Sequence, residues 1–595
     1  GVVTAAPYAA GGARLALSPV RFTQGHGGLA FSTVASIDGP LADGRVRGLT
    51  LPLSGRAGRT VEVNAACVPL VFSSLSIAGM TIGATRLPLC PVGGAMLRVV
   101  KGRAGGGMAV PQPRLVGRVG GQPLTIGAAD LRVDIAEAGF TVDRMRVRLG
   151  GEGGTRLDVA NLRGRTGAGG IGGRFTGADG AIANVPLLLT RGEGGWRLAN
   201  GRLALTAAAT VSDADAAPRF HPLSAPDIAL DLAAGVIRVT GSLREPRSGV
   251  RVTDVAIRHD LRAGEGGATL AVPGITFGPA FQPEAITRLT LGIVANVAGT
   301  VSGGGRVDWS RAGVTSSGEF ATEDMNLAAA FGPVTGISTK IHFSDLLKLE
   351  TPPGQIVTVA AFNPGIAVEG GIVGYQLLAG QKVAVGGGKW PFFGGALILE
   401  PTVLDFGQPV ERRMTFRVEA MDAAKFLERF DFRNVAATGL FDGSLPMIFD
   451  ERGGRISGGR LVVRPPGGTL AYVGELTNKD LGMFGKLAFD ALKSIRYSNL
   501  AIELDGALDS EIVSRIVFTG TNESPKDEHA RGWLKDLTGL PFRFNIVIRA
   551  PFRGLTSSAE AFVNPRGLIG DAALRGATIV EDGAPVKPPL SRNER

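Results

Sequence analysis

The sequence contains few residues of the kinds that build catalytic or metal centres. There are two cysteines and five histidines among 595 residues. No histidine begins an H-E-x-x-H motif or lies near a cysteine at the spacing of zinc ligands, and no serine lies in a G-x-S-x-G elbow. Asp213 with Asp215 is the kind of acidic pair that forms a turn or strand edge more often than a catalytic dyad. We therefore expect no enzyme, and no catalytic, cofactor-binding or metal-binding residues.

Long apolar runs and clustered charge are also missing. No segment has 18 consecutive apolar residues, so no part of the sequence is expected to span a membrane as a helix. Basic residues never form a run of five, and aromatic residues make up only 6%. These features argue against a nucleic-acid partner. The net charge of +10 fits a surface facing anionic lipid, and it fits simple solubility equally well. The sequence begins at Gly1 without a signal region, so we expect any membrane anchor to lie upstream.

The two cysteines, Cys67 and Cys90, end short apolar runs beside prolines. In an oxidising compartment, two cysteines in one region favour a disulfide that closes a hairpin-sized loop. The alternative is a pair of buried, reduced thiols that act as small hydrophobic side chains. The disulfide is the favoured interpretation.

Glycine is abundant, with 89 residues, and 35 prolines accompany it without the three-residue period of collagen. Glycine supplies the positive φ angles of tight hairpin turns, so this composition predicts many short strands. Alternation of apolar and polar residues with a period of two supports the same interpretation. It occurs at 131–135, 144–149, 227–232, 415–419 and 543–549. The fold class is therefore mainly β, with one face of the sheet apolar and the other polar.

Two segments near the C-terminus show helical periodicity. The first is 422–432, and the second is 479–495, with Asn478 as its candidate N-cap. The apolar residues proposed for the second helix are Leu481, Phe484, Leu487, Leu492 and Ile495. Such a helix could be a plug, a lid or a membrane-surface element, but packing onto the sheet is favoured. Residues 521–531 are expected to form an exposed loop, and residues 576–595 a disordered tail.

An ordered series of short motifs follows in the second half of the sequence. The series comprises Gly305–Trp309, Phe343–Leu347, Thr351–Gln355, Asn363–Gly365, Trp390–Gly395, Gly443–Asp450, Pro465–Tyr472, Leu540–Asn545 and Ala550–Phe552. This series resembles the C-terminal region of the YdbH-type intermembrane phospholipid transport proteins, a branch of the AsmA-like group. That region has also carried the label of a dicarboxylate transport domain. The resemblance covers roughly 250 residues and is weaker upstream, where mainly the Cys67–Cys90 segment and Phe281–Pro283 look similar.

The resemblance implies a long, curved antiparallel sheet rolled into a U-shaped groove with an apolar interior. It divides the chain into an N-terminal and middle part at 1–290, a C-terminal groove region at 291–575 and the tail. It also implies a periplasmic location in the envelope of a Gram-negative bacterium, an inner-membrane anchor and a small outer-membrane lipoprotein partner that adds a strand to the sheet. At about 4.8 Å between strands, roughly 35–40 strands would extend on the order of 170–190 Å, long enough to cross between two membranes.

The predicted function is a passive conduit that carries phospholipids between the inner and outer membranes. The predicted lipid-contacting residues are Phe416, Val418, Phe544, Ile546 and Ile548. Three alternatives stay open: an envelope assembly factor that guides β-proteins by its sheet edges, a dicarboxylate carrier, and a hydrolase of lipid or polysaccharide. The carrier lacks membrane spans or a compact cationic pocket, and the hydrolase lacks a recognisable nucleophile.

Overall fold

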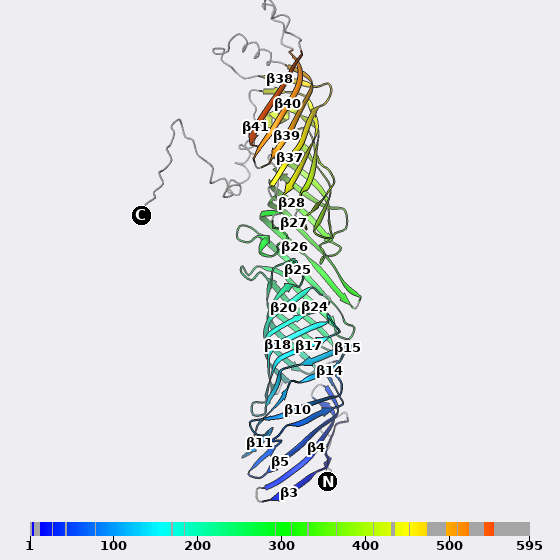
Figure 1. The fold of residues 1–595 in the computed structure, drawn as a ribbon, viewed down its shortest axis with the longest axis vertical. Helices are drawn as coiled ribbons and strands as arrows, with labels where there is room; N and C mark the ends of the chain where they lie inside the picture. Colours follow the sequence, from blue (N-terminus) through cyan, green and yellow to red (C-terminus); the bar gives the residue numbers. More distant parts are fainter. Residues whose placement is uncertain are drawn as a thin grey trace, which may run out of the picture.

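The chain forms an elongated column in which oblique strands follow one another along the long axis (Figure 1). The computed structural model describes residues 3–551 except for 5–11, 26–27, 42–43, 78, 168–169, 184, 292, 311, 330–331, 364–365, 409, 430–434, 451–452, 473–494, 509 and 523–540. All 41 strands belong to one antiparallel sheet. The prediction of a mainly β chain with a single long antiparallel sheet is confirmed.

The N-terminal part of the column consists of short strands around two long ones. They are β1 (Val3–Thr4), β2 (Arg14–Leu17), β3 (Arg21–Gly25), β4 (Gly28–Leu41), β5 (Gly44–Ala57), β6 (Thr60–Val63), β7 (Val68–Phe72), β8 (Ser74–Ile77), β9 (Met80–Ile82), β10 (Thr85–Val92), β11 (Leu97–Val100), β12 (Arg103–Gly105), β13 (Gly107–Pro111), β14 (Arg114–Val119), β15 (Gln122–Gly127) and β16 (Asp130–Asp134).

The middle part is a regular meander of long strands, and each pairs with the next. They are β17 (Gly139–Leu149), β18 (Thr155–Gly167), β19 (Gly170–Ala181), β20 (Leu187–Ala199), β21 (Arg202–Asp213), β22 (Leu223–Ala233), β23 (Val236–Arg244), β24 (Arg251–Asp260), β25 (Glu265–Phe277), β26 (Val294–Ser310), β27 (Gly313–Ala329) and β28 (Gly332–Phe343). One 3₁₀ turn, η1 (Pro283–Ala285), lies between β25 and β26.

The C-terminal part continues the same sheet. Its strands are β29 (Gln355–Phe362), β30 (Val368–Leu378), β31 (Lys382–Phe392), β32 (Gly395–Leu399), β33 (Thr402–Asp405), β34 (Arg412–Asp422), β35 (Val435–Ala437), β36 (Leu440–Asp450), β37 (Gly453–Val463), β38 (Gly468–Tyr472), β39 (Ile495–Ala507), β40 (Glu511–Asn522) and β41 (Pro541–Pro551). The one α-helix among the described residues is α1 (Ala423–Arg429).

The turns show why so much glycine is needed. Between β20 and β21, Asn200 and Gly201 have φ angles of +52° and +71°. Both values lie in the left-handed region, as a two-residue type I′ hairpin turn requires, and Asn-Gly is the sequence pair that adopts it most readily. The strong right-handed twist of such turns matches that of the strands, so the meander continues without splaying apart.

In the N-terminal part the sheet divides into three short ladders. Along its length, β5 pairs with β8, then β7, then β6. The ladders through β7 and β8 both reach β17, which pairs with β16 near its start and with β15 near its end. Arg144, with a φ of +49°, separates these two pairings on β17. The long single meander begins from β17 onward.

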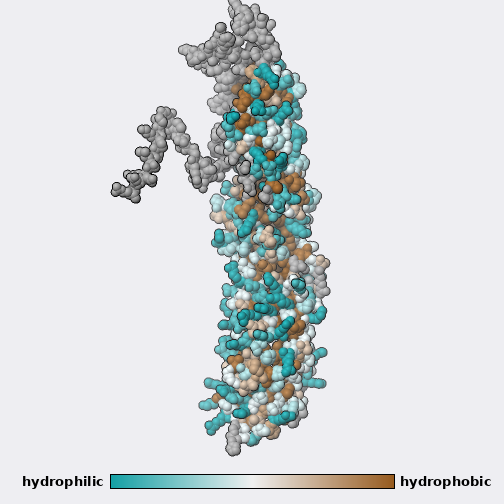
Figure 2. Space-filling model, in the orientation of Figure 1, coloured by the Kyte–Doolittle hydropathy of each residue, from teal (hydrophilic) through white to brown (hydrophobic). Residues whose placement is uncertain are grey.

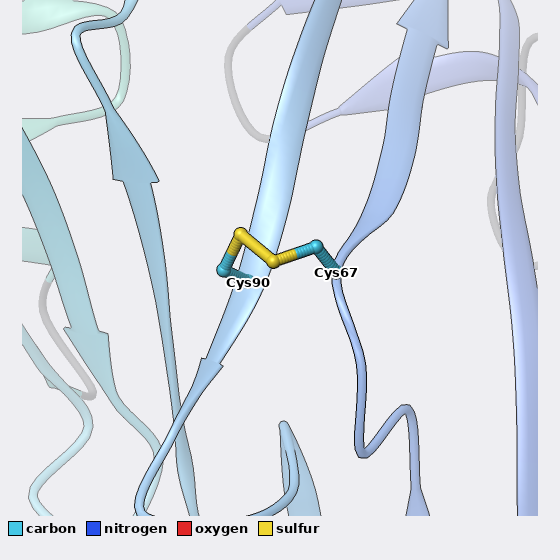
Figure 3. Close-up of a disulfide and its surroundings, with 2 residues drawn as sticks. All are labelled: Cys67 and Cys90. Carbon is cyan, nitrogen blue, oxygen red and sulfur yellow. A yellow bond between two sulfur atoms is a disulfide. The ribbon is translucent and has the colours of Figure 1, made fainter.

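A disulfide joins two neighbouring strands of this divided region. Cys67 precedes β7 and Cys90 lies in β10 (Figure 3), and their Sγ atoms are bonded at 2.05 Å. The bond extends the β7–β10 ladder by one position, because Leu89 already lies opposite Val68. No free cysteine remains in the described part of the chain.

Replacing both cysteines by serine is expected to lower the free energy of unfolding of this region by about 3 kcal/mol. The bond closes a loop with a sequence separation of 23 residues and so reduces the conformational entropy of the unfolded chain. Hydrogen exchange of β7 and β10 during denaturant titration measures this effect. The amides of β37, far along the column, are the internal control and should be unchanged. Equal loss of protection in both places would contradict a local role for the bond.

The helical predictions need correction. The segment 422–432 contains α1, which is shorter and spans Ala423–Arg429. The segment 479–495 lies outside the described residues up to 494, and so do Leu481, Phe484, Leu487 and Leu492. Ile495, its last residue, is the first residue of β39 and is 1% exposed. The helical spacing misplaced it because one isolated apolar residue fits either period. Most of the predicted loop 521–531 and the tail at 576–595 also lie outside the described residues.

Candidate functional site

One face of the middle sheet carries an uninterrupted row of apolar residues. Residues that lie directly opposite each other on paired strands point to the same face. The row runs through Phe140, Gly164, Gly173, Trp196, Leu205, Leu230, Val239, Ile257, Ala268 and Val307, from β17 to β26. We call the face that bears this row the apolar face.

The large side chains of this row are half-buried from Phe140 to Ile257, whereas Val307 at the end of the row is 8% exposed. The half-buried side chains are those of Phe140, Trp196, Leu205, Leu230, Val239 and Ile257. Neighbouring side chains therefore cover only part of each one. An apolar surface of this length normally folds away from water or binds something apolar.

One glycine, Gly164, makes room for the aromatic end of the row. A side chain at Gly164 would come within 2.6 Å of Phe140 and 2.8 Å of Trp196. The two rings lie 6.0 Å apart, centre to centre. The Trp196 Nε1–H donates to the carbonyl oxygen of Arg163 at 3.2 Å, which satisfies the indole and fixes its orientation. The ring thus lies over Gly164 as part of the apolar face.

The opposite face of the same strands is polar. The row next to the apolar one runs through Arg197, Ala204, Asp231, Arg238, Arg258, Gly267 and Asp308. An ion pair joins Arg202 to Asp231 on this face. Figure 2 shows one side of the column, where hydrophilic residues dominate and hydrophobic ones reach the surface in patches. These strands therefore have one polar face and one apolar face.

In the C-terminal part the apolar face continues, but it is packed. The row runs through Trp390, Leu397, Val418, Gly443, Leu461, Ile502, Ile516 and Ile546. Val418 is 1% exposed, and Phe416, two residues earlier on β34, is 8% exposed. The ring of Phe416 lies 6.4 Å from Phe362 and 6.2 Å from Trp390. Apolar side chains of β28–β40 thus bury one another here, and Phe416 and Val418 belong to this core.

The last strand is more open. Phe544 stacks on Phe518 with ring centres 4.5 Å apart, while Ile546, one step along the apolar face, is 39% exposed. The backbone of Ile548 lies opposite Ser514 in the same register, and its side chain is outside the described residues. The register therefore places all five predicted lipid-contacting positions on the apolar face. Of the four whose side chains are described, Ile546 is the most accessible.

The comparison with known families identifies the chain. The sequence profile of the YdbH-like family, described as intermembrane phospholipid transport protein YdbH, matches residues 1–570. The chain belongs to the YdbH-like family. No curated protein and no solved structure matches it. The match extends well upstream of the motifs between Gly305 and Phe552, and it includes the whole half-buried row.

Membership in the YdbH-like family assigns the chain to phospholipid transport between membranes. The half-buried apolar row was not among the residues predicted from sequence. Its signal was present in the alternation at 227–232, which contains Leu230. That pattern identified a strand but did not say which apolar residues neighbouring strands would leave uncovered.

The acidic pair Asp213 and Asp215 has a structural explanation in this YdbH-like chain. The Asp213 side chain is fully buried and accepts two hydrogen bonds from the Arg219 guanidinium, at 2.7 and 2.9 Å. It also accepts the backbone N–H groups of Asp215 and Arg219. Burial acts to raise the pKa of Asp213, but these hydrogen bonds outweigh it and hold the pKa below its ordinary value. Asp213 is thus a fully bonded turn residue.

The hydrogen-bonded pair of Asp213 and Arg219 predicts that the turn is destabilised in acid. A carboxylate whose folded pKa is depressed stabilises the fold fully above its unfolded pKa, near 3.9, and the stabilisation is lost as pH falls through the folded value. We expect the protection factors of residues 214–222, which are exchange rates corrected for the intrinsic pH dependence of amide exchange, to stay constant from about pH 5 to 8 and to fall only below about pH 4. Loss of protection already near pH 6 would contradict this prediction.

The described part of the chain contains no group of three or more His, Cys, Asp or Glu side chains that could hold a metal ion. It also contains no helix long and apolar enough to cross a membrane.

Proposed function

We propose that this protein is a passive conduit along which phospholipids move between the inner and outer membranes of a bacterial envelope, without enzymatic chemistry. The observation that carries the proposal is the continuous apolar row from Phe140 to Val307, whose large side chains from Phe140 to Ile257 are left half-buried. Family membership supports phospholipid as the cargo.

The geometry explains how movement could be passive. Each methylene removed from water contributes about 0.8 kcal/mol, so an acyl chain is held on the apolar face. An acyl chain that moves from Leu205 to Leu230, Val239 and Ile257 exchanges one aliphatic neighbour for another. Because successive positions are chemically alike, none of them traps the chain. The phosphate headgroup can remain in water, beyond the edge of the sheet.

The environment and partners are part of the proposal. We place the protein in the periplasm, anchored to the inner membrane, with a small outer-membrane lipoprotein as partner. Among the described residues β41 pairs with β40 alone, through eleven directly opposed positions, so its other edge is available to an added strand. The same edge supports the second candidate, an assembly factor that guides β-proteins.

Native mass spectrometry of the purified chain tests the conduit. We expect phospholipid to remain bound and to be released by detergent. A photocrosslinker at Ile546 should capture lipid, while one at Val547, which is 52% exposed on the opposite face, should not. Capture of protein clients along β41, without lipid at Ile546, would favour the assembly factor. A chain that holds no lipid and forms no lipid adduct would overturn the conduit.

A further inference from the structure

Two opposite rims of the sheet meet in the middle of the column. The 214–222 loop joins β21 to β22 at one rim, and the loop between β28 and β29 lies at the other rim. A rim is the long edge of the sheet where successive antiparallel strands turn. The first loop follows the Val211–Leu223 pair of β21 and β22, and the second follows β28, whose Phe343 lies opposite Gly318 of β27. The chain turns alternately at one rim and the other, and these two loops fall at opposite rims. Yet Arg219 Nη1 donates to the carbonyl oxygen of Leu347 at 2.7 Å, across 128 residues of sequence.

The loop from the second rim lies over the apolar face. Leu346 occupies the space above Gly305, where an added Cβ would come within 2.5 Å of the leucine side chain. Gly305 precedes Val307 by two positions on β26, so both belong to the apolar face. Ser316, opposite Val307, donates to Asp345 at 2.6 Å and accepts the Leu347 N–H at 3.0 Å. The loop is therefore fastened to the apolar face by one apolar and two polar contacts.

Loops of the first rim cover the apolar face from the other side. Phe220, Phe281 and Ile286 pack against apolar residues of β24, β25 and β27. The His221 N–H donates to the Ile286 carbonyl oxygen at 2.7 Å, and the Thr287 hydroxyl donates to the Arg219 carbonyl oxygen. We call residues 214–222, 278–287 and 344–350 together the rim bridge.

The rim bridge separates two different stretches of the apolar face. On its N-terminal side lies the half-buried row that includes Leu205, and on its C-terminal side lies the packed core around Phe416. Bridge side chains occupy the apolar face between these stretches. An acyl chain that passes from one to the other must therefore displace them.

We propose that the rim bridge is a gate in the lipid path and that Arg219 holds it shut. This inference rests on the conduit proposed above. The Arg219 guanidinium, neutralised by Asp213, links the two rims, so opening requires loss of the contact with Leu347. The side chain of Leu346 then lifts from Gly305 and leaves an apolar surface for the acyl chain. Arg219 and Leu346 would thereby set how readily lipid crosses the middle of the column.

Site-specific crosslinking on both sides of the gate tests this proposal. The full chain, with a polyhistidine tag at its N-terminus, is held on nickel-chelating vesicles of phosphatidylethanolamine and phosphatidylglycerol. A benzoyl-phenylalanine replaces Leu205 in one preparation and Ile546 in another. The readout is the ratio of lipid adduct at 546 to that at 205.

Leu346→Ala is expected to raise this ratio about tenfold, because removing a contact made only in the closed state shifts the population toward the open one. Arg219→Lys retains the charge but loses the bidentate guanidinium, so it should also raise the adduct ratio. The matched control is Arg306→Ala. Arg306 pairs with Asp308 on the polar face of β26, the strand whose Gly305 lies beneath Leu346. The ratio for this variant should equal that of the unchanged chain.

The outcomes separate the two proposals. Lipid adducts at both positions with the same ratio in all variants would overturn the gate and leave the conduit standing. Absence of lipid adducts at both positions in every variant would overturn the conduit itself. Hydrogen exchange of β25–β27 checks that Leu346→Ala stays folded, and if it does not, Arg219→Lys alone decides.

Discussion

Leu230→Asp is expected to slow phospholipid transfer between vesicles at least about tenfold, because an acyl chain that passes this position must strip water from a carboxylate. Leu230 lies at the centre of the apolar row, between Leu205 and Val239. Its side chain is half-buried, so the carboxylate can remain hydrated while no lipid is present, and the fold should persist. The measurement is the transfer rate of a fluorescent phospholipid from donor to acceptor vesicles.

The matched control for this experiment is Ala229→Asp. Ala229 is the adjacent residue on the same strand, and it is exposed on the polar face. The two variants have the same charge and differ in the face that carries it. Equal transfer rates for both would show that the apolar face of β22 does not lie on the lipid path.

Phe416→Asp is expected to destabilise the C-terminal part by at least about 4 kcal/mol, through loss of aromatic packing and burial of an unpaired carboxylate. Phe416 is 8% exposed and lies against Phe362 and Trp390. The expected result is early loss of hydrogen-exchange protection in β34 and β36 on denaturant titration. The strands β20–β24 should keep theirs, since they share no core with this residue.

Phe416→Leu is the control for packing without charge, and a smaller loss of about 1–2 kcal/mol is expected for it. If the aspartate variant were as stable as the leucine variant, the side chain at this position would have to reach water. Phe416 would then be an open lipid contact and not a member of the core.

Local structure along the chain was predictable from the sequence because strand alternation needs only neighbouring residues. The alternation at 415–419 and 543–549 identified β34 and β41 and the apolar side of each. Asn200-Gly201 is a turn for a local reason too, since few other residue pairs adopt two positive φ angles in succession. The motifs between 305 and 552 indicated the right family, and the match to its profile extends further upstream.

Continuity of the apolar face, in contrast, depends on bulges that alternation alone does not locate. On β34 the pairing shifts between Val418 and Met421, where Ala420 has a φ of +52°. Met421 thereby returns to the apolar side after an odd step of three residues, and it is 4% exposed. A strict period of two would place it on the polar face. Only pairing with β36 determines where the extra residue lies.

The alternation of apolar and polar residues within single strands and the many tight turns were thus determined by the sequence itself, since each depends on near neighbours. The tertiary structure alone decided which apolar residues stay half-buried and which become core. It also decided that Arg219 meets Leu347 across the column. Both outcomes depend on how far the sheet curls and on which loops fold over its face. Those are long-range properties, and no local pattern of residues encodes them.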